Sequence, residues 1–194
     1  YKIEKEGYNE VTGSEKVVIT KAKGSVNAPT SKTLTYTGSS QELINKGSTS
    51  TGTIEYKIEG GTYSTSIPTG IKAGTYKVFY RVVGDKNHED VTEASISVTI
   101  SKAANTLTLS ENTKTYTYPT SGTFEITENK SGGTLTCTSD NTSIATCKIE
   151  GNIVTVVPGT KEGQAIITIK SASTANYEGT QVVYVVNTAK GTLN

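Results

Sequence analysis

Alternation of hydrophobic and polar residues is the strongest pattern in this chain, and it is clearest in residues 73–103. Tyrosine or valine occupies every second position from Tyr76 to Val82, and isoleucine or valine does so from Ile96 to Ile100. A period of two predicts antiparallel strands that bury one face. The polar sequence KNHED between the two runs predicts the turn of a hairpin.

The end of this hairpin occurs three times in the chain. It is followed by an alanine at Ala22, Ala103 and Ala189, and isoleucine or valine stands three residues before each alanine. The copies are 81 and 86 residues apart, which is the size of whole β-domains and not of solenoid repeats. The repeat predicts the last two strands of a preceding immunoglobulin-like (Ig-like) domain in residues 1–22, complete domains in 23–102 and 103–188, and a following strand or tail in 189–194.

Each complete domain shows about seven short strands separated by turn signals. Gly60-Gly61 and Gly151-Asn152 are typical of hairpin turns, and the first of them predicts a strand at Thr62–Ser66. The chain is rich in Thr, Ser, Gly and Val, lacks Met and Trp, and shows no sustained helical spacing. The predicted fold class is all-β, with tandem Ig-like β-sandwiches of about seven antiparallel strands each.

Two motifs carry a resemblance to known families. AGTYKV at residues 73–78 has the spacing of a tyrosine corner, with Gly74 and Tyr76 as its structural residues. The first domain resembles the Ig-like repeats of large bacterial surface proteins. The second, with TSDNTSIATC and GQAIITI, resembles the bacterial Ig-like group 2 family, although Ala165 replaces the corner tyrosine. These resemblances imply a fold more sharply than a function, because such domains serve adhesins, enzymes and phage virions alike.

Charge and hydropathy exclude two classes of partner. The net charge is +1 and lysine and glutamate are interspersed, so the basic stripe that nucleic acid requires is missing. No apolar run reaches the roughly 18 residues of a membrane span, so no membrane insertion is predicted for this segment. The chain begins at Tyr1 without a visible signal peptide, which we interpret as a piece of a longer exported polypeptide. The predicted location is extracellular, on a bacterial cell or secreted, with a virion surface as the alternative.

Cys137 and Cys147 allow two interpretations. Both can be reduced core residues, since free cysteine is often buried. They can also form a disulfide, which an even cysteine count in an exported chain favours. Such a link would join strands on either side of the SDNTS turn, unlike the inter-sheet bridge of antibody domains.

No catalytic, cofactor or metal site is predicted, so the chain is not expected to be an enzyme. His88 lies between Asp85 and Asp90, in a sequence typical of a solvated turn and without the ligand order of a calcium loop. A single histidine cannot supply a catalytic triad in each domain. Among the tyrosines of the first domain, Tyr36, Tyr56, Tyr76 and Tyr80 are expected to be core or corner residues, and Tyr63 is expected to be the exposed one. The alternative is a tyrosine patch that contacts a glycan or protein.

The predicted function is that of a non-catalytic stalk or spacer in an extracellular surface protein of the adhesin type. Neighbouring Ig-like domains of the same polypeptide would be its partners, and a distal region would do the binding. The alternative is a module that itself binds a host protein or glycan, on a bacterial adhesin or a phage fibre. A third class, the accessory domain of a surface enzyme, depends on sequence outside this chain.

Overall fold

The computed structural model describes residues 1–191, and every regular secondary-structure element in that range is a β-strand. The strands are β1 (Lys2–Ile3), β2 (Val11–Thr12), β3 (Thr30–Ser31), β4 (Leu34–Thr35), β5 (Gln41–Glu42), β6 (Ile44–Asn45), β7 (Gly52–Ile58), β8 (Thr69–Gly70), β9 (Gly74–Gly84), β10 (Val91–Ser101), β11 (Leu107–Leu109), β12 (Thr113–Thr117), β13 (Gly122–Asn129), β14 (Leu135–Ser139), β15 (Ala145–Glu150), β16 (Ile153–Pro158), β17 (Gly163–Ser171) and β18 (Thr180–Ala189).

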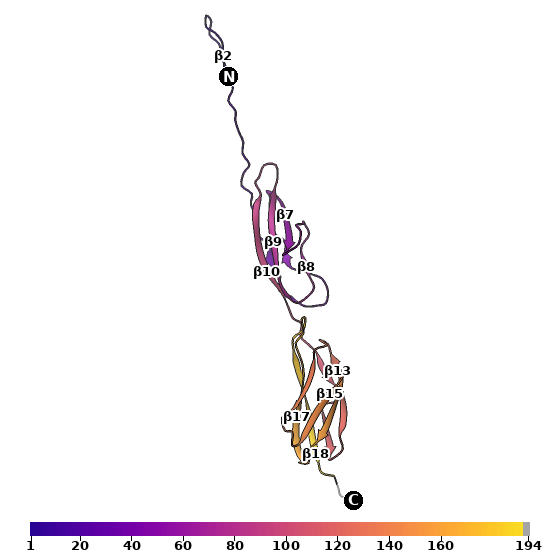
Figure 1. Cartoon of the computed structure of the whole chain (residues 1–194). Helices are drawn as coiled ribbons and strands as arrows, with labels where there is room; N and C mark the ends of the chain where they lie inside the picture. Colours follow the sequence, from indigo (N-terminus) through magenta and orange to yellow (C-terminus); the bar gives the residue numbers. More distant parts are fainter. Residues whose placement is uncertain (192–194) are drawn as a thin grey trace. The chain divides into compact units, whose positions relative to one another are not determined.

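Strands β3 to β10 form a sandwich that we call the first sandwich (Figure 1). Its main sheet has the order β4-β10-β9-β7, and two small sheets pair β3 with β6 and β5 with β8. In β9 the predicted alternation buries Val78 and Val82 completely, because these side chains point to one face of the sheet. The core of this region comprises Leu43, Ile44, Ile54, Tyr56, Val78, Val82, Val98 and Ile100.

Strands β11 to β18 form the second sandwich, from two four-stranded sheets (Figure 1). One sheet has the order β12-β18-β17-β14 and the other β11-β13-β16-β15. Aromatic and β-branched residues of both sheets fill the space between them, and the rings of Phe124 and Tyr184 stack at 3.9 Å between centroids. The buried core comprises Leu107, Tyr116, Phe124, Ile126, Ile144, Ala145, Val154, Val156, Ala165, Ile167, Ile169, Tyr184 and Val186.

The predicted fold class is confirmed: the described chain is all-β and contains tandem Ig-like sandwiches. Two pairs are parallel, however, since β4 runs beside β10 and β12 beside β18 in the same direction. The strand predicted at Thr62–Ser66 is wrong. Only Ser64 pairs there, in an isolated bridge to Tyr56, because the chain bends at Thr65 and Ser66 and the ladder does not continue.

The N-terminal residues contain the short pair β1 and β2, with Ile3 opposite Val11. No strand is formed from residue 13 to residue 21. The domain boundaries derived from the repeat stay predictions. At the other end, β18 runs to Ala189, and residues 192–194 of the predicted C-terminal segment lie outside the described residues.

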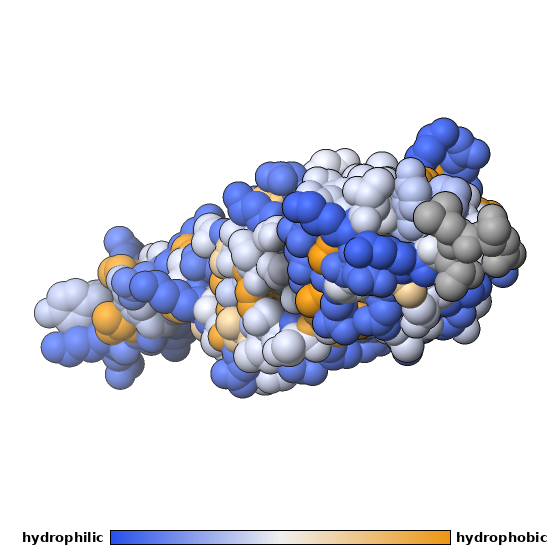
Figure 2. Space-filling view, turned by 90° about the horizontal axis from the view of Figure 1, so that it is seen from below, coloured by the Kyte–Doolittle hydropathy of each residue, from blue (hydrophilic) through white to orange (hydrophobic). Residues whose placement is uncertain are grey.

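The surface seen in Figure 2 is mostly hydrophilic or neutral, and hydrophobic residues appear as small separate patches. On the second sandwich, exposed large hydrophobic residues include Ile153, Val157, Ile166 and Val183. Isolated apolar side chains of this kind are usual on soluble domains. Residues 1–191 include no helix with the length and apolar character needed to cross a membrane.

Candidate functional site

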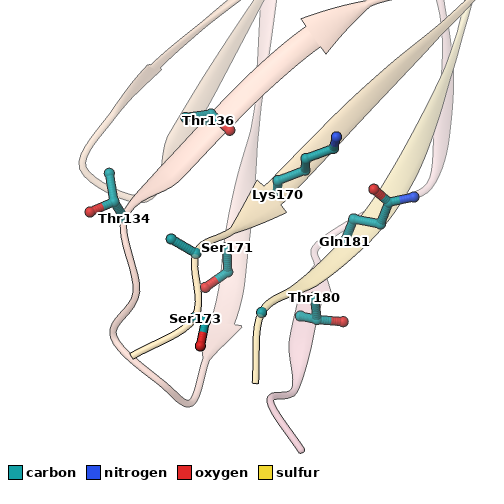
Figure 3. Close-up of a pocket in the computed structure, with 9 residues that line it drawn as sticks. Thr134, Thr136, Lys170, Ser171, Ser173, Thr180 and Gln181 are labelled. Carbon is teal, nitrogen blue, oxygen red and sulfur yellow. The ribbon is translucent and has the colours of Figure 1, made fainter. Parts of the chain in front are cut away.

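A hollow of about 610 Å³ opens on the outer face of the sheet β12-β18-β17-β14 (Figure 3). Three strands contribute a row of side chains to it, because Thr136 of β14 lies opposite Lys170 of β17, which lies opposite Gln181 of β18. Thr134, Ser173 and Thr180 line the hollow beside that row. Most of the lining residues therefore carry a hydroxyl group, beside one ammonium and one amide, although the exposed surface of the hollow is mainly apolar.

The depth of the hollow follows from small residues where the strands end. Ala172 and Gly179 line it beyond the row of larger side chains. A Cβ atom at Gly179 would lie 3.1 Å from the backbone nitrogen of Ser173 and 3.2 Å from the carbonyl oxygen of Ser171. Glycine therefore permits this close approach of the backbone, and a larger residue would push the connection outward.

Ser171 forms the inner side of this end of the sheet and is only 3% exposed. Its Oγ donates to Asn129 Oδ1 at 2.8 Å and accepts from Asn105 Nδ2 at 3.0 Å. Asn105 Oδ1 in turn accepts from the backbone N–H of Ser131 at 2.9 Å. These bonds satisfy polar groups that would be costly to bury unpaired, and they fix the strand ends that support the hollow.

The chemistry of the hollow suits binding more than reaction. Lys170 is exposed, and no carboxylate of the described residues forms an ion pair with it. Its ammonium and the Gln181 amide can donate to hydroxyl or carboxylate oxygens, and the threonine hydroxyls can donate or accept. No imidazole or carboxylate lines the site, so a serine or threonine there has no adjacent general base.

Tyr63, the tyrosine predicted at the surface of the first sandwich, lies against charged side chains. The guanidinium carbon of Arg81 is 4.0 Å from the ring centroid and Lys57 Nζ is 4.5 Å from it. Both cations are also ion-paired, Arg81 with Glu55 at 2.8 Å and Lys57 with Glu93 at 2.9 Å. A sugar can stack only on a ring face that these cations leave open.

The Tyr63 hydroxyl donates to the carboxylate of Glu93. Desolvation of the phenol, together with this bond, raises the pKa of Tyr63 to about 12. The same bond is the main reason why the pKa of Glu93 lies below its ordinary value. The hydroxyl is thus a neutral donor at physiological pH and is already used within the protein.

The residues of the predicted tyrosine corner meet at the start of β9. Tyr76 Oη donates to the carbonyl oxygen of Lys72 at 2.8 Å, a bond that reaches back along the chain as a tyrosine corner does. Gly74 has a φ of +148°, a backbone conformation that residues with a side chain rarely adopt. Gly163 has a φ of +143° at the matching place in the second sandwich, where Ala165 is buried instead of a tyrosine.

The structure pairs Cys137 with Cys147 in a disulfide, with 6.2 Å between their Cα atoms. Cys137 lies in β14 and Cys147 in β15, and these are edge strands of the two opposite sheets. The expectation that the link differs from an inter-sheet bridge is therefore wrong. The turn after β14 carries the chain from one sheet to the other, so residues that flank it face each other across the core.

His88 lies in the turn between β9 and β10. Its Nδ1 is 2.8 Å from Asp85 Oδ1, which also accepts from the backbone N–H of Asn87 at 2.8 Å. The hydrogen bond with His88 is the largest cause that lowers the pKa of Asp85. No group of three or more His, Cys, Asp or Glu side chains within residues 1–191 is placed to hold a metal ion.

Sequence reasoning missed the side chains that line the hollow. Their alternation along β14, β17 and β18 predicts which of them face outward, but it leaves open which residues lie opposite one another. Thr136 and Lys170 are separated by two intervening strands of the other sheet. The row therefore depends on strand register, and a single sequence does not specify that register.

Comparisons with known proteins give a fold likeness only. No protein-family model matches the chain, and no curated protein matches it, so the resemblance of the second domain to the group 2 family stays a prediction. Among solved structures, the S-layer protein rSbsC(31-844) is 23% identical, with a TM-score of 0.35, over 75% of this chain and 21% of that one. Domains 4 and 5 of the S-layer protein SbsC are 20% identical, with a TM-score of 0.38, over 86% and 99%.

The titin domains Z1Z2, solved in complex with telethonin, are 10% identical, with a TM-score of 0.44, over 89% of this chain and 100% of that one. This chain spans about a fifth of the length of the rSbsC structure. Likeness at these levels of identity and superposition transfers no activity, ligand or location to this chain. The function has to be argued from its own residues.

Proposed function

We propose that this chain is a non-catalytic spacer segment of an extracellular, multidomain surface protein, in which Ig-like sandwiches hold a binding region away from the surface. The observation that carries the proposal is the parallel pairing of an early strand with the last strand of the second sandwich. Residues Thr113–Thr117 of β12 lie opposite Val185–Ala189 of β18 in five consecutive pairs. This arrangement suits a segment that is pulled at both ends.

The mechanical argument follows from strand direction. Tension toward the N-terminus pulls β12 toward its own start, and tension toward the C-terminus pulls β18 toward its own end. Because the two strands are parallel, these forces slide one strand along the other, and the inter-strand hydrogen bonds are stretched together. An antiparallel pair loaded at one end would instead open one bond at a time.

Side chains add to this pairing. Tyr116 of β12 is buried, and its Oη lies 3.0 Å from Tyr184 Oη of β18. The first sandwich has the same parallel arrangement in shorter form, since β4 and β10 pair only Leu34 with Ile100 and Thr35 with Ser101. We therefore expect both sandwiches to resist tension, and the second to resist more.

The disulfide supports an extracellular setting, because such bonds persist in oxidising compartments. Cys137 and Cys147 join the sheets at the edge opposite β12. The bond therefore leaves the β12–β18 pair free to respond to tension while it holds the other edge closed.

Single-molecule stretching of the chain tests the proposal. Directly before β12, the carbonyl oxygen of Asn112 accepts from the N–H of Val185 at 2.9 Å. The parallel pattern therefore directs the Lys114 N–H toward β18 and the Thr115 N–H away from it. Lys114→Pro should lower the force needed to unfold the second sandwich, and Thr115→Pro, the matched control, should lower it less. Unfolding at the same low force for the unmodified chain and both variants would count against a tension-bearing spacer.

A second candidate is favoured by the hollow around Lys170: a module that itself binds a hydroxylated or acidic glycan. The row of Thr136, Lys170 and Gln181 offers donors at a shallow, solvent-open surface. Binding of the chain to an immobilised glycan panel, lost in Lys170→Ala and kept in Lys148→Ala, would support this function. Lys148 is a suitable control because it is exposed on the other sheet and pairs with Glu150. A panel without a bound glycan would remove the candidate.

A further inference from the structure

The N-terminal 22 residues expose an unusual number of large hydrophobic side chains. Those exposed in this segment are Tyr1, Ile3, Tyr8, Val11, Val17, Val18 and Ile19. Val17 is 83% exposed and Ile19 is 92% exposed. Both lie in residues 13–21, which form no strand. Contiguous exposed apolar residues on a soluble protein usually mark a surface that another element covers.

The internal repeat shows what happens to the same positions elsewhere in the chain. Five residues before the repeat alanines stand Val17, Val98 and Tyr184, and three residues before them stand Ile19, Ile100 and Val186. The four residues in β10 and β18 are at most 1% exposed and belong to the cores of their sandwiches. The pattern that is buried twice in this chain is therefore exposed in its first copy.

The face of the segment opposite Val17 and Ile19 also matches its counterparts in the repeat. Val18, which points away from Val17 and Ile19 in an extended strand, matches Thr99 in β10 and Val185 in β18. Thr99 is exposed and Val185 is half-buried. The segment thus has one side with core character and one side that its counterparts leave in contact with solvent.

The register of β1 and β2 explains why Val17 and Ile19 have no partner strand among the described residues. Lys2 lies opposite Thr12, and the N–H of Gly13 donates to the carbonyl oxygen of Tyr1 at 3.3 Å. In an antiparallel pair each step forward on one strand is a step back on the other. Positions opposite Val17 and Ile19 therefore precede Tyr1 in the register.

We propose that residues 10–20 are the last strand of a third Ig-like sandwich, and that Val17 and Ile19 dock into the core formed by its other strands. The occupant of this surface is the upstream part of the same polypeptide. Its strand next to residues 13–20 continues β1 backwards, and its facing sheet covers the two side chains. Two such cores in this chain already accept valine, isoleucine or tyrosine at these positions.

The test compares the full-length polypeptide that contains this segment with the 194-residue chain. In the full-length polypeptide, the double variant Val17→Asp/Ile19→Asp should lower the thermal midpoint of the third sandwich by more than about 10 °C, because two charges would enter its apolar core. Val18→Asp, the matched control, should shift that midpoint by only a few degrees. In the 194-residue chain, neither variant should change the midpoints of the two sandwiches.

Hydrogen exchange gives a second readout. The amides of residues 14–20 should exchange quickly in the 194-residue chain and slowly in the full-length polypeptide. Equal effects of the double variant and Val18→Asp at full length would overturn the proposal. So would the absence of an Ig-like sandwich ahead of Tyr1. Dimers of the 194-residue chain that depend on Val17 and Ile19 would assign the surface to a second copy instead, and would also overturn it.

Discussion

Tyr184 Oη lies 3.0 Å from Tyr116 Oη in the interior of the second sandwich, and this contact joins β18 to β12. Tyr184 donates its own proton to Glu111 Oε1 at 2.9 Å, so the Tyr116 hydroxyl is the donor between the two tyrosines. The Phe124 ring stacks on Tyr184 at 3.9 Å. Burial is the main reason why the pKa of Tyr184 lies above its ordinary value.

Tyr184→Phe should destabilise the second sandwich by about 1–3 kcal/mol, because it leaves the buried Tyr116 hydroxyl without its acceptor. Urea unfolding followed by circular dichroism measures this change. Tyr118→Phe is the matched control, since Tyr118 is 44% exposed and its loss of a hydroxyl should cost little. Equal unfolding curves for Tyr184→Phe and the unmodified chain would show that the hydrogen bonds of the Tyr184 hydroxyl contribute nothing to stability.

Tyr63 should titrate at about pH 12, clearly above the ordinary tyrosine value near 10. A raised pKa means that the folded state holds this proton more tightly than the unfolded state does. Its contribution to stability is therefore complete below pH 10 and decreases as the pH rises from 10 to 12. Site-resolved NMR titration of the ring carbons measures it. Glu93→Gln should lower the Tyr63 pKa only part of the way, because desolvation is the larger cause.

Tyr76→Phe should destabilise the first sandwich by about 1 kcal/mol through loss of the hydrogen bond to the Lys72 carbonyl oxygen. Tyr80→Phe is its control, because Tyr80 is also half-buried in β9 and is not at the corner position. Thermal unfolding of both variants gives the comparison. If Tyr80→Phe costs as much as Tyr76→Phe, the corner bond has no special role in stability.

The fold was largely predictable because its signals are local. Period-two alternation places Val78 and Val82 on the buried face of β9, and Gly151-Asn152 stands between β15 and β16 as the turn chemistry requires. The two-residue strands β3, β5, β6 and β8 carry no such pattern. They exist because long-range pairing supplies hydrogen bonds to short polar segments, which local propensity does not reveal.

The candidate site was not predictable to the same extent, because the hollow requires Thr136 opposite Lys170 and Lys170 opposite Gln181. Other features of the second sandwich also depend on contacts between distant residues. Glu111 lies outside every strand and reaches Tyr184, 73 residues away. The parallel course of β12 and β18 is a matter of topology and not of composition. The inter-sheet position of the disulfide likewise required knowing that the SDNTS turn changes sheets. Each of these features is set by register or crossover, where many alternatives fit the same local sequence.

Reduction of the disulfide should destabilise the second sandwich by about 2–3 kcal/mol, since it frees a closed loop of about 10 residues in the unfolded chain. Thermal unfolding with and without a reductant measures this. The first sandwich contains no cysteine, and its transition serves as the internal control. Alkylation of both cysteines in the untreated, folded chain would contradict the bond itself.

The same bond makes a prediction that stretching can measure as a length. Cys137 and Cys147 are 10 residues apart in sequence, with 6.2 Å between their Cα atoms, so an intact disulfide hides the residues between them from the extended chain. Because an extended residue spans about 3.3–3.6 Å, reduction should lengthen the unfolding step of the second sandwich by about 30 Å and leave the other step unchanged. The peak force should change little if the β12–β18 pair sets it, since the disulfide lies at the opposite edge. A large fall in force on reduction would instead place the mechanical resistance at the β14–β15 edge.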